Sequence, residues 1–168
     1  MLKYIIIFIS LNAYCGHLNE YNSKKSTLDS AIIGIMQVMS NKKSLQPNQA
    51  MKLVAAANIS CAKYGIPVNV VLAIAFVESS YRLNAVNKGS NDYGIMQVNQ
   101  YHVDRGADKQ RLLTDLQYSF DQGVKVFSWF YKTYPLDEAI MRYNCGTRSS
   151  CVDLKSVKRY LRLVKKAL

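Results

Sequence analysis

Glutamate is rare in this 168-residue chain, and one of its three glutamates stands where a carboxyl group could transfer protons. Glu78 directly follows the apolar run VVLAIAFV at 70–77. Burial among apolar side chains disfavours the ionised carboxylate, so we expect the pKa of Glu78 to rise. A carboxylic acid that stays protonated near neutral pH can act as a general acid. The alternative is a glutamate at a helix end that turns its side chain into solvent.

The remaining candidate groups are less informative. Glu20 lies in a polar connector, and Glu138 begins a short helical pattern, where an acidic side chain favours the helix dipole. Asp92 is close enough in sequence to provide a second carboxylate, which a hydrolysis by an activated water would use. Within an Asn- and Gly-rich loop, however, capping a turn is the ordinary role of an aspartate. His17 and His102 are isolated, so neither a metal nor a cofactor is expected.

Helices must position this carboxyl group. Pro47 suits a first helical turn and Gly65 a C-terminal stop, which predicts a helix over 47–64. The next helix begins near Pro67 and is apolar nearly all round, as in a buried central helix. Further helical patterns occupy 115–133, 136–143 and 152–168, whereas 84–106 is rich in Asn, Gly, Ser and Asp and predicts a loop or short hairpin. The chain is therefore expected to be mainly α, with at most a small β-hairpin.

The pentapeptide GIMQV occurs twice, at 34–38 and 94–98. The first copy lies in a predicted amphipathic helix that begins at a capping box formed by Ser26 and Asp29. The helix would place Gly34 and Gln37 on its outer face. Its apolar stripe comprises Leu28, Ile32, Ile35, Met36 and Met39. The first copy is therefore interpreted as a coincidence within an ordinary helix.

The N-terminus has the outline of an export signal. A single cation, Lys3, precedes a nearly unbroken apolar stretch that is too short to span a bilayer. We expect a signal peptide or N-terminal anchor over 1–15, a polar connector over 16–27 and one domain over 28–168. The protein would then be exported to the periplasm or cell envelope.

Four cysteines suit an exported protein. Cys145 and Cys151 enclose the short segment GTRSS and are the best candidates for a disulfide. Cys61 lies in a helical pattern and is expected either to be a buried free thiol or to pair with Cys15, if that residue survives processing.

The chain carries 22 Lys and Arg against 11 Asp and Glu, a formal net charge of +11. Such a balance indicates either an anionic partner or a generally basic surface. The helix predicted over 152–168 has a basic face, which leaves peripheral contact with a membrane open. Its apolar stripe is more simply the packing face of the last helix, and nucleic acid is not favoured as a partner.

Three motifs together resemble one family. The pair Glu78–Ser79, the string SNDYGIMQVN at 90–99 and the dipeptide Tyr143–Asn144 are similar to motifs of the lytic transglycosylases with a soluble-lytic-transglycosylase, lysozyme-like domain. The resemblance covers about residues 50–165 and is strongest to the small members that accompany secretion and conjugation systems. It implies a lysozyme-like single domain, the mainly helical version of the α+β lysozyme superfold.

The resemblance also implies a reaction. Glu78 would be the acid and base that cleaves the MurNAc–GlcNAc β-1,4 bond of peptidoglycan without water and leaves 1,6-anhydro-MurNAc ends. The positions implied to bind substrate are Ser79, Ser90, Met96, Gln97, Asn99, Tyr143 and Asn144. Glycan strands would be the partner, along with components of a secretion, conjugation, pilus or phage-entry machine. A lysozyme-type hydrolase that uses Asp92 and a non-catalytic wall-binding protein remain the alternatives.

Overall fold

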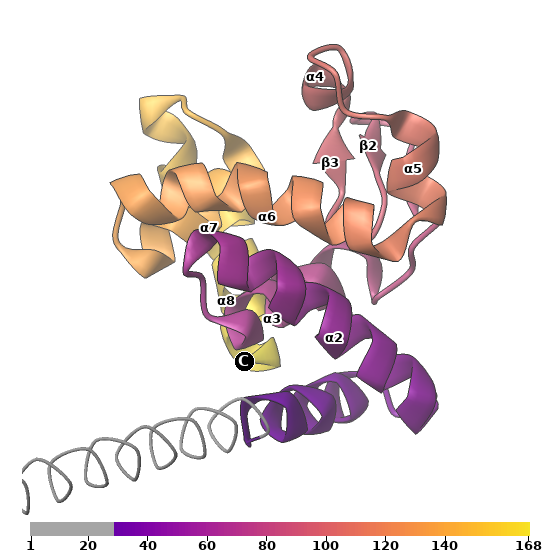
Figure 1. Ribbon diagram of the computed structural model, residues 1–168. Helices are drawn as coiled ribbons and strands as arrows, with labels where there is room; N and C mark the ends of the chain where they lie inside the picture. The colour runs from indigo at the N-terminus through magenta and orange to yellow at the C-terminus, as the bar shows by residue number, and fades with distance from the viewer. Residues whose placement is uncertain (1–28) are drawn as a thin grey trace, which may run out of the picture. The chain divides into compact units, whose positions relative to one another are not determined.

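The structure is a computed structural model that describes residues 29–168 (Figure 1). The expected signal segment, the polar connector, the capping residue Ser26 and Cys15 lie outside the described residues. Contacts within the chain divide it into two units, Met1–Ile33 and Gly34–Leu168. Of the first unit, only residues 29–33 are described, and these are helical. Within residues 29–168, no helix combines the length and apolarity that a membrane crossing requires.

The second unit is mainly helical, as predicted. Its long helices are α2 (Pro47–Tyr64), α3 (Val68–Ser79), α6 (Leu116–Thr133), α7 (Leu136–Cys145) and α8 (Lys155–Ala167), and a 3-10 helix covers Ser149–Asp153. Gly65 ends α2 in the left-handed conformation, which glycine adopts without strain, and the Asp115 side chain caps α6 by accepting from the Tyr118 N–H. These local signals explain why both helices have the boundaries that the sequence predicts.

The small β region is confirmed and contains a third strand. β1 (Val86–Asn87), β2 (Asp92–Tyr93) and β3 (Val98–Asn99) form an antiparallel sheet in the order β1-β2-β3. Asp92 pairs with Asn87 on one side and with Asn99 on the other. Two short helices, α4 (Gln100–Val103) and α5 (Lys109–Thr114), follow where no helix was predicted. In Figure 1, α6 extends from this region to α7.

The central helix α3 is the core of the second unit. Its residues from Val71 to Ala75 are fully buried, and α3 packs against both α2 and α8. Cys61 of α2 is buried too, and it forms no disulfide with the other described cysteines. Burial raises the pKa of the Cys61 thiol to about 12. The predicted burial of Cys61 is confirmed, and its raised pKa disfavours the reactive thiolate. Pairing with Cys15, which lies outside the described residues, stays a prediction.

The first GIMQV lies in a helix over residues 29–41, but the predicted face of that helix is wrong. Gly34 and Val38 are buried, whereas Met36 is exposed. A Cβ atom at Gly34 would lie only 3.1 Å from a methyl group of Val54, so the glycine allows a close approach to α2. Gln37 donates from its side-chain amide to the carbonyl oxygen of Ala167 at 2.9 Å. The first copy is a packing element.

Candidate active site

Glu78 lies in the last turn of α3. The helix stops directly behind it because Ser80 and Tyr81 adopt left-handed backbone conformations, with φ of 51° and 60°. Such conformations are energetically unfavourable for residues other than glycine, and they concentrate at functional sites. The Ser79 hydroxyl donates to the carbonyl oxygen of Ile95 at 2.8 Å and so ties this helix end to the segment that carries the second GIMQV.

The Glu78 carboxyl group is partly buried and has one side-chain hydrogen-bond donor. The hydroxyl of Tyr160, on α8, donates to Glu78 Oε1 at 2.6 Å. Burial raises the pKa of Glu78 to about 7; the Tyr160 hydrogen bond opposes this rise, and the negative charge of Asp92 adds to it. The sequence-based expectation of a raised pKa is confirmed, so Glu78 can exchange a proton near neutral pH.

The second GIMQV forms the tight turn between β2 and β3. A Cβ atom at Gly94, where φ is 82°, would lie 2.4 Å from the carbonyl oxygen of Leu112, so only glycine fits. Gln97 has a φ of 51°, and its side-chain amide donates to the carbonyl oxygens of Gly94 and Ala85. Met96 is fully buried, and a Cβ atom at Gly123 would collide with its side chain. The segment thus forms a rigid support beside Glu78.

Asp92 belongs to a polar cluster with two other predicted residues. The Ser90 hydroxyl donates to Asp92 Oδ2, and the Asn99 amide donates to Asp92 Oδ1 at 2.7 Å. The same amide donates to the Ser90 carbonyl oxygen, while Asn99 Oδ1 caps α4 by accepting from the Tyr101 N–H at 3.0 Å. Each carboxylate oxygen of Asp92 therefore has a donor within the protein.

A groove of about 950 Å³ opens over Glu78. Most of the predicted site residues line it: Glu78, Ser90, Asp92, Gln97, Asn99, Tyr143 and Asn144. Ser79 and Met96 do not, since their side chains are buried beneath it. Met96 acts through its backbone, because its carbonyl oxygen accepts from the Tyr143 hydroxyl at 2.7 Å. Within the described part of the chain, no group of three or more His, Cys, Asp or Glu could hold a metal ion.

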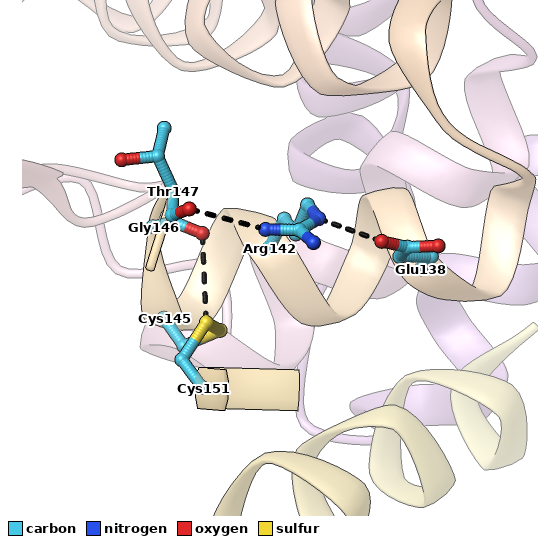
Figure 2. The surroundings of a disulfide bond; sticks show 6 residues. All are labelled: Glu138, Arg142, Cys145, Gly146, Thr147 and Cys151. Atoms are coloured by element: carbon cyan, nitrogen blue, oxygen red, sulfur yellow. Dashed lines mark hydrogen bonds and ion pairs between the residues drawn. A yellow bond between two sulfur atoms is a disulfide. The ribbon is translucent and has the colours of Figure 1, made fainter. Parts of the chain in front are cut away.

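The predicted disulfide between Cys145 and Cys151 is present and stabilises one wall of the groove (Figure 2). Cys145, Gly146 and Thr147 line that wall. The nearly buried Arg142 donates to Glu138 at 2.8 Å, and its guanidinium stacks over Tyr134 at 4.2 Å. Figure 2 shows its other arm reaching the Thr147 carbonyl oxygen. The disulfide and the Arg142 contact together fix this wall of the groove.

Sequence reasoning did not place Tyr160 among the site residues. A signal was available, because Tyr160 shares the buried face of its helix with Val157 and Val164. A buried tyrosine needs a partner for its hydroxyl group, and the partner here is Glu78. Two further walls of the groove, one formed by α6 and the other by the segment around α4, contain none of the predicted site residues.

Comparison with known proteins identifies the family of this chain. The chain matches the family described as "Transglycosylase SLT domain" over residues 55–162. Protein IpgF of Shigella flexneri is 37% identical over 93 residues, which cover 51% of this chain and 61% of that protein. Invasion protein IagB of Salmonella typhi is 32% identical over 109 residues, which cover 60% of this chain and 67% of that protein.

The matched range contains the positions of Glu78, the second GIMQV, the Tyr143–Asn144 pair and Tyr160. It also covers α3 and α6, which support the groove. The chain belongs to the transglycosylase SLT domain family.

Proposed function

We propose that the protein is a peptidoglycan lytic transglycosylase with Glu78 as its acid and base. The glycan would lie in the groove, with the bond between MurNAc and GlcNAc at the carboxyl group. Ser90, Asn99, Tyr143 and Asn144 line the groove where they could contact the sugar chain. Ser79 and Gln97 position the segments around Glu78 through their backbone contacts.

In the proposed reaction, protonated Glu78 gives its proton to the glycosidic oxygen as the bond to C1 of MurNAc breaks. GlcNAc leaves with that proton. The C6 hydroxyl oxygen of the same MurNAc then bonds to C1, with help from the substrate's N-acetyl group, and its proton passes to the Glu78 carboxylate. The ring closes as 1,6-anhydro-MurNAc, the acid is restored, and no water is consumed. One carboxyl group suffices, as in other substrate-assisted glycosidases.

The observation that carries the proposal is the pKa of about 7 for a carboxyl group that faces a long groove. A group with this pKa is populated in both protonation states at neutral pH, which a residue that alternates between acid and base requires. The Tyr160 hydroxyl holds the carboxyl group in one orientation.

Hydrolysis is the second candidate, because Asp92 lines the same groove. A hydrolase would need Asp92 to activate a water or to stabilise the positive charge that develops on the sugar. Both carboxylate oxygens already accept from Ser90 and Asn99, which suits a structural role between β2 and β3. This arrangement favours transglycosylation.

We further propose an exported enzyme that opens the wall locally for an envelope-spanning machine. The name of one relative, an invasion protein, agrees with that setting. The expected location is the periplasm or cell envelope, with residues 1–15 as a signal peptide or anchor. The specific machine, whether for secretion, conjugation, pilus assembly or phage entry, would be identified by which process fails in cells that carry Glu78→Gln.

The test is a digestion of purified peptidoglycan by the wild-type protein and by Glu78→Gln, with the released fragments analysed by mass spectrometry. Muramyl ends lighter by one water, released only by the wild type, would support the proposal. Reducing ends released by the wild type and lost in Asp92→Asn would support hydrolysis instead. Binding to the wall without release by either protein would favour the non-catalytic alternative.

A further inference from the structure

The groove extends over one face of α6. Gln122, Lys125, Val126 and Trp129 line it, and their spacing of i, i+3, i+4 and i+7 places them on the same side of the helix. Trp129 is 53% exposed despite its size. Five residues of the segment around α4 line the groove too: Tyr101, His102, Arg105, Gly106 and Ala107. This part of the groove has no role in the proposed proton transfers.

Two cations gather here. Arg105 and Lys125 both line the groove and are exposed, and within residues 29–168 neither forms an ion pair. His102, which lines the groove too, responds to both charges: burial lowers the pKa of its imidazole, and the positive charges of Arg105 and Lys125 lower it further. Both cations therefore act on the same stretch of the groove.

The arginine is held in place. Its guanidinium stacks over the Tyr101 ring at 3.4 Å from the ring centroid, and Nη1 donates to the Tyr101 carbonyl oxygen at 3.2 Å. This stacking orders the planar group and leaves its other N–H donors free for a carboxylate. The acidic residues that line the groove are Glu78 and Asp92, and both serve the site already described.

We propose that Arg105 and Lys125 form a subsite for a carboxylate of the peptide stem on the bound glycan strand, with Trp129 as its apolar wall. This inference rests on the proposed function, because it takes peptidoglycan as the ligand of the groove. The enzyme would then select strands whose stems carry free carboxylates. Two exposed charge contacts of this kind correspond to a preference of about fivefold to tenfold.

The test measures the binding of soluble glycan strands to the full chain carrying Glu78→Gln, by calorimetry, so that no turnover interferes. One strand preparation carries native stems, and the other has its stem carboxylates converted to amides of nearly the same size. Tighter binding of the native strands, by about fivefold to tenfold, is expected. Adding Arg105→Gln and Lys125→Gln should reduce this ratio to near one. The matched control, Lys43→Gln with Lys52→Gln, removes the same charge from exposed positions outside the groove and should keep the ratio.

Equal binding of the two preparations would overturn the subsite. So would an equal loss of the ratio in both double variants, because that result would reflect only the overall charge. Failure of the proposed function would appear separately, as the absence of fragments with anhydro ends when the wild-type protein digests either preparation. A circular-dichroism melt of each variant checks that the exposed substitutions leave the fold intact.

Discussion

At the scale of single residues, the central feature is the pairing of Glu78 with Tyr160. Burial and the hydrogen bond shift the pKa of the carboxyl group in opposite directions, and burial prevails. The two effects come from different helices. The apolar run of α3 accounts for the burial of the carboxyl group, and α8 supplies the hydroxyl donor. The site therefore depends on packing between segments far apart in the sequence.

The pH profile tests this balance. Cleavage by the wild type should fall as pH rises through about 7, because the first step needs protonated Glu78. Tyr160→Phe removes a donor that stabilises the carboxylate, so the pKa of Glu78 should rise and the alkaline limb of kcat/KM should move to higher pH. Tyr143→Phe is the matched control, because that hydroxyl donates to the Met96 carbonyl oxygen instead. A limb that stays fixed or moves down in Tyr160→Phe would contradict the assignment.

Stability offers an independent check on the same residue. The pKa of Glu78 is about 7 in the folded chain and near its ordinary 4.5 in the unfolded chain. The stability associated with the protonated carboxyl group is thus fully present below about 4.5 and lost as pH rises through 7. Above that pH the loss is about 3 kcal/mol.

Glu78→Gln cannot ionise and can still accept from Tyr160. It should therefore unfold at higher denaturant concentration than the wild type at pH 8 and at nearly the same concentration at pH 4. Chemical denaturation at both pH values measures the difference. Equal midpoints at pH 8 would mean that the carboxylate is well solvated in the folded protein.

At the scale of elements, the two GIMQV copies show what identical residues do in different surroundings. Gly34 lies within a helix beside the side chains of Val54 and Leu72, whereas Gly94 turns between strands against a backbone carbonyl group with φ of 82°. The substitution Gly→Ala at each position is therefore a matched pair. Gly94→Ala should cost several kcal/mol because backbone atoms must shift.

At Gly34, the helix propensity gained by alanine, about 1 kcal/mol, is opposed by the 3.1 Å approach to Val54, so a change near zero is expected. Thermal unfolding of the two variants gives the comparison. Similar losses in both would show that the second copy is no more constrained than the first.

Particular elements show how much of the fold and of the site the sequence could predict. The helices α2 and α6 could be predicted because their stop and cap signals are local, and Glu78 stood out because an apolar run precedes it. The buried face of the helix over 29–41 could not be predicted, since it depends on how closely Gly34 approaches Val54. The placing of Arg105 and Lys125 in one groove could not be predicted either, because it depends on how the segment after α4 packs near α6.

At the scale of the whole molecule, the net charge of +11 suits the proposed action on an insoluble anionic wall. Four cations of α8 follow one another at i, i+4, i+7 and i+11 on its exposed side, and none forms an ion pair within the described residues: Lys155, Arg159, Arg162 and Lys166. Their side of the helix lies opposite the buried residues Tyr160 and Val164, so they are free to contact an anionic polymer.

Binding to the wall should accordingly weaken as salt is added, because exposed charges are screened. Glu78→Gln should bind as well as the wild type, while replacing all four α8 cations with Gln should lower binding and flatten its dependence on salt. Sedimentation of the protein with peptidoglycan across a salt series measures both effects. Binding that does not respond to salt would remove the electrostatic explanation.

The central claim is that Glu78 cleaves the glycan without adding water, and digestion in water labelled with heavy oxygen tests it most directly. Transglycosylation takes the oxygen of the new ring from the substrate's own C6 hydroxyl group, so the account predicts unlabelled muramyl ends and no release in Glu78→Gln. Muramyl ends that carry one heavy oxygen would mean that water attacks the sugar, and would contradict the account.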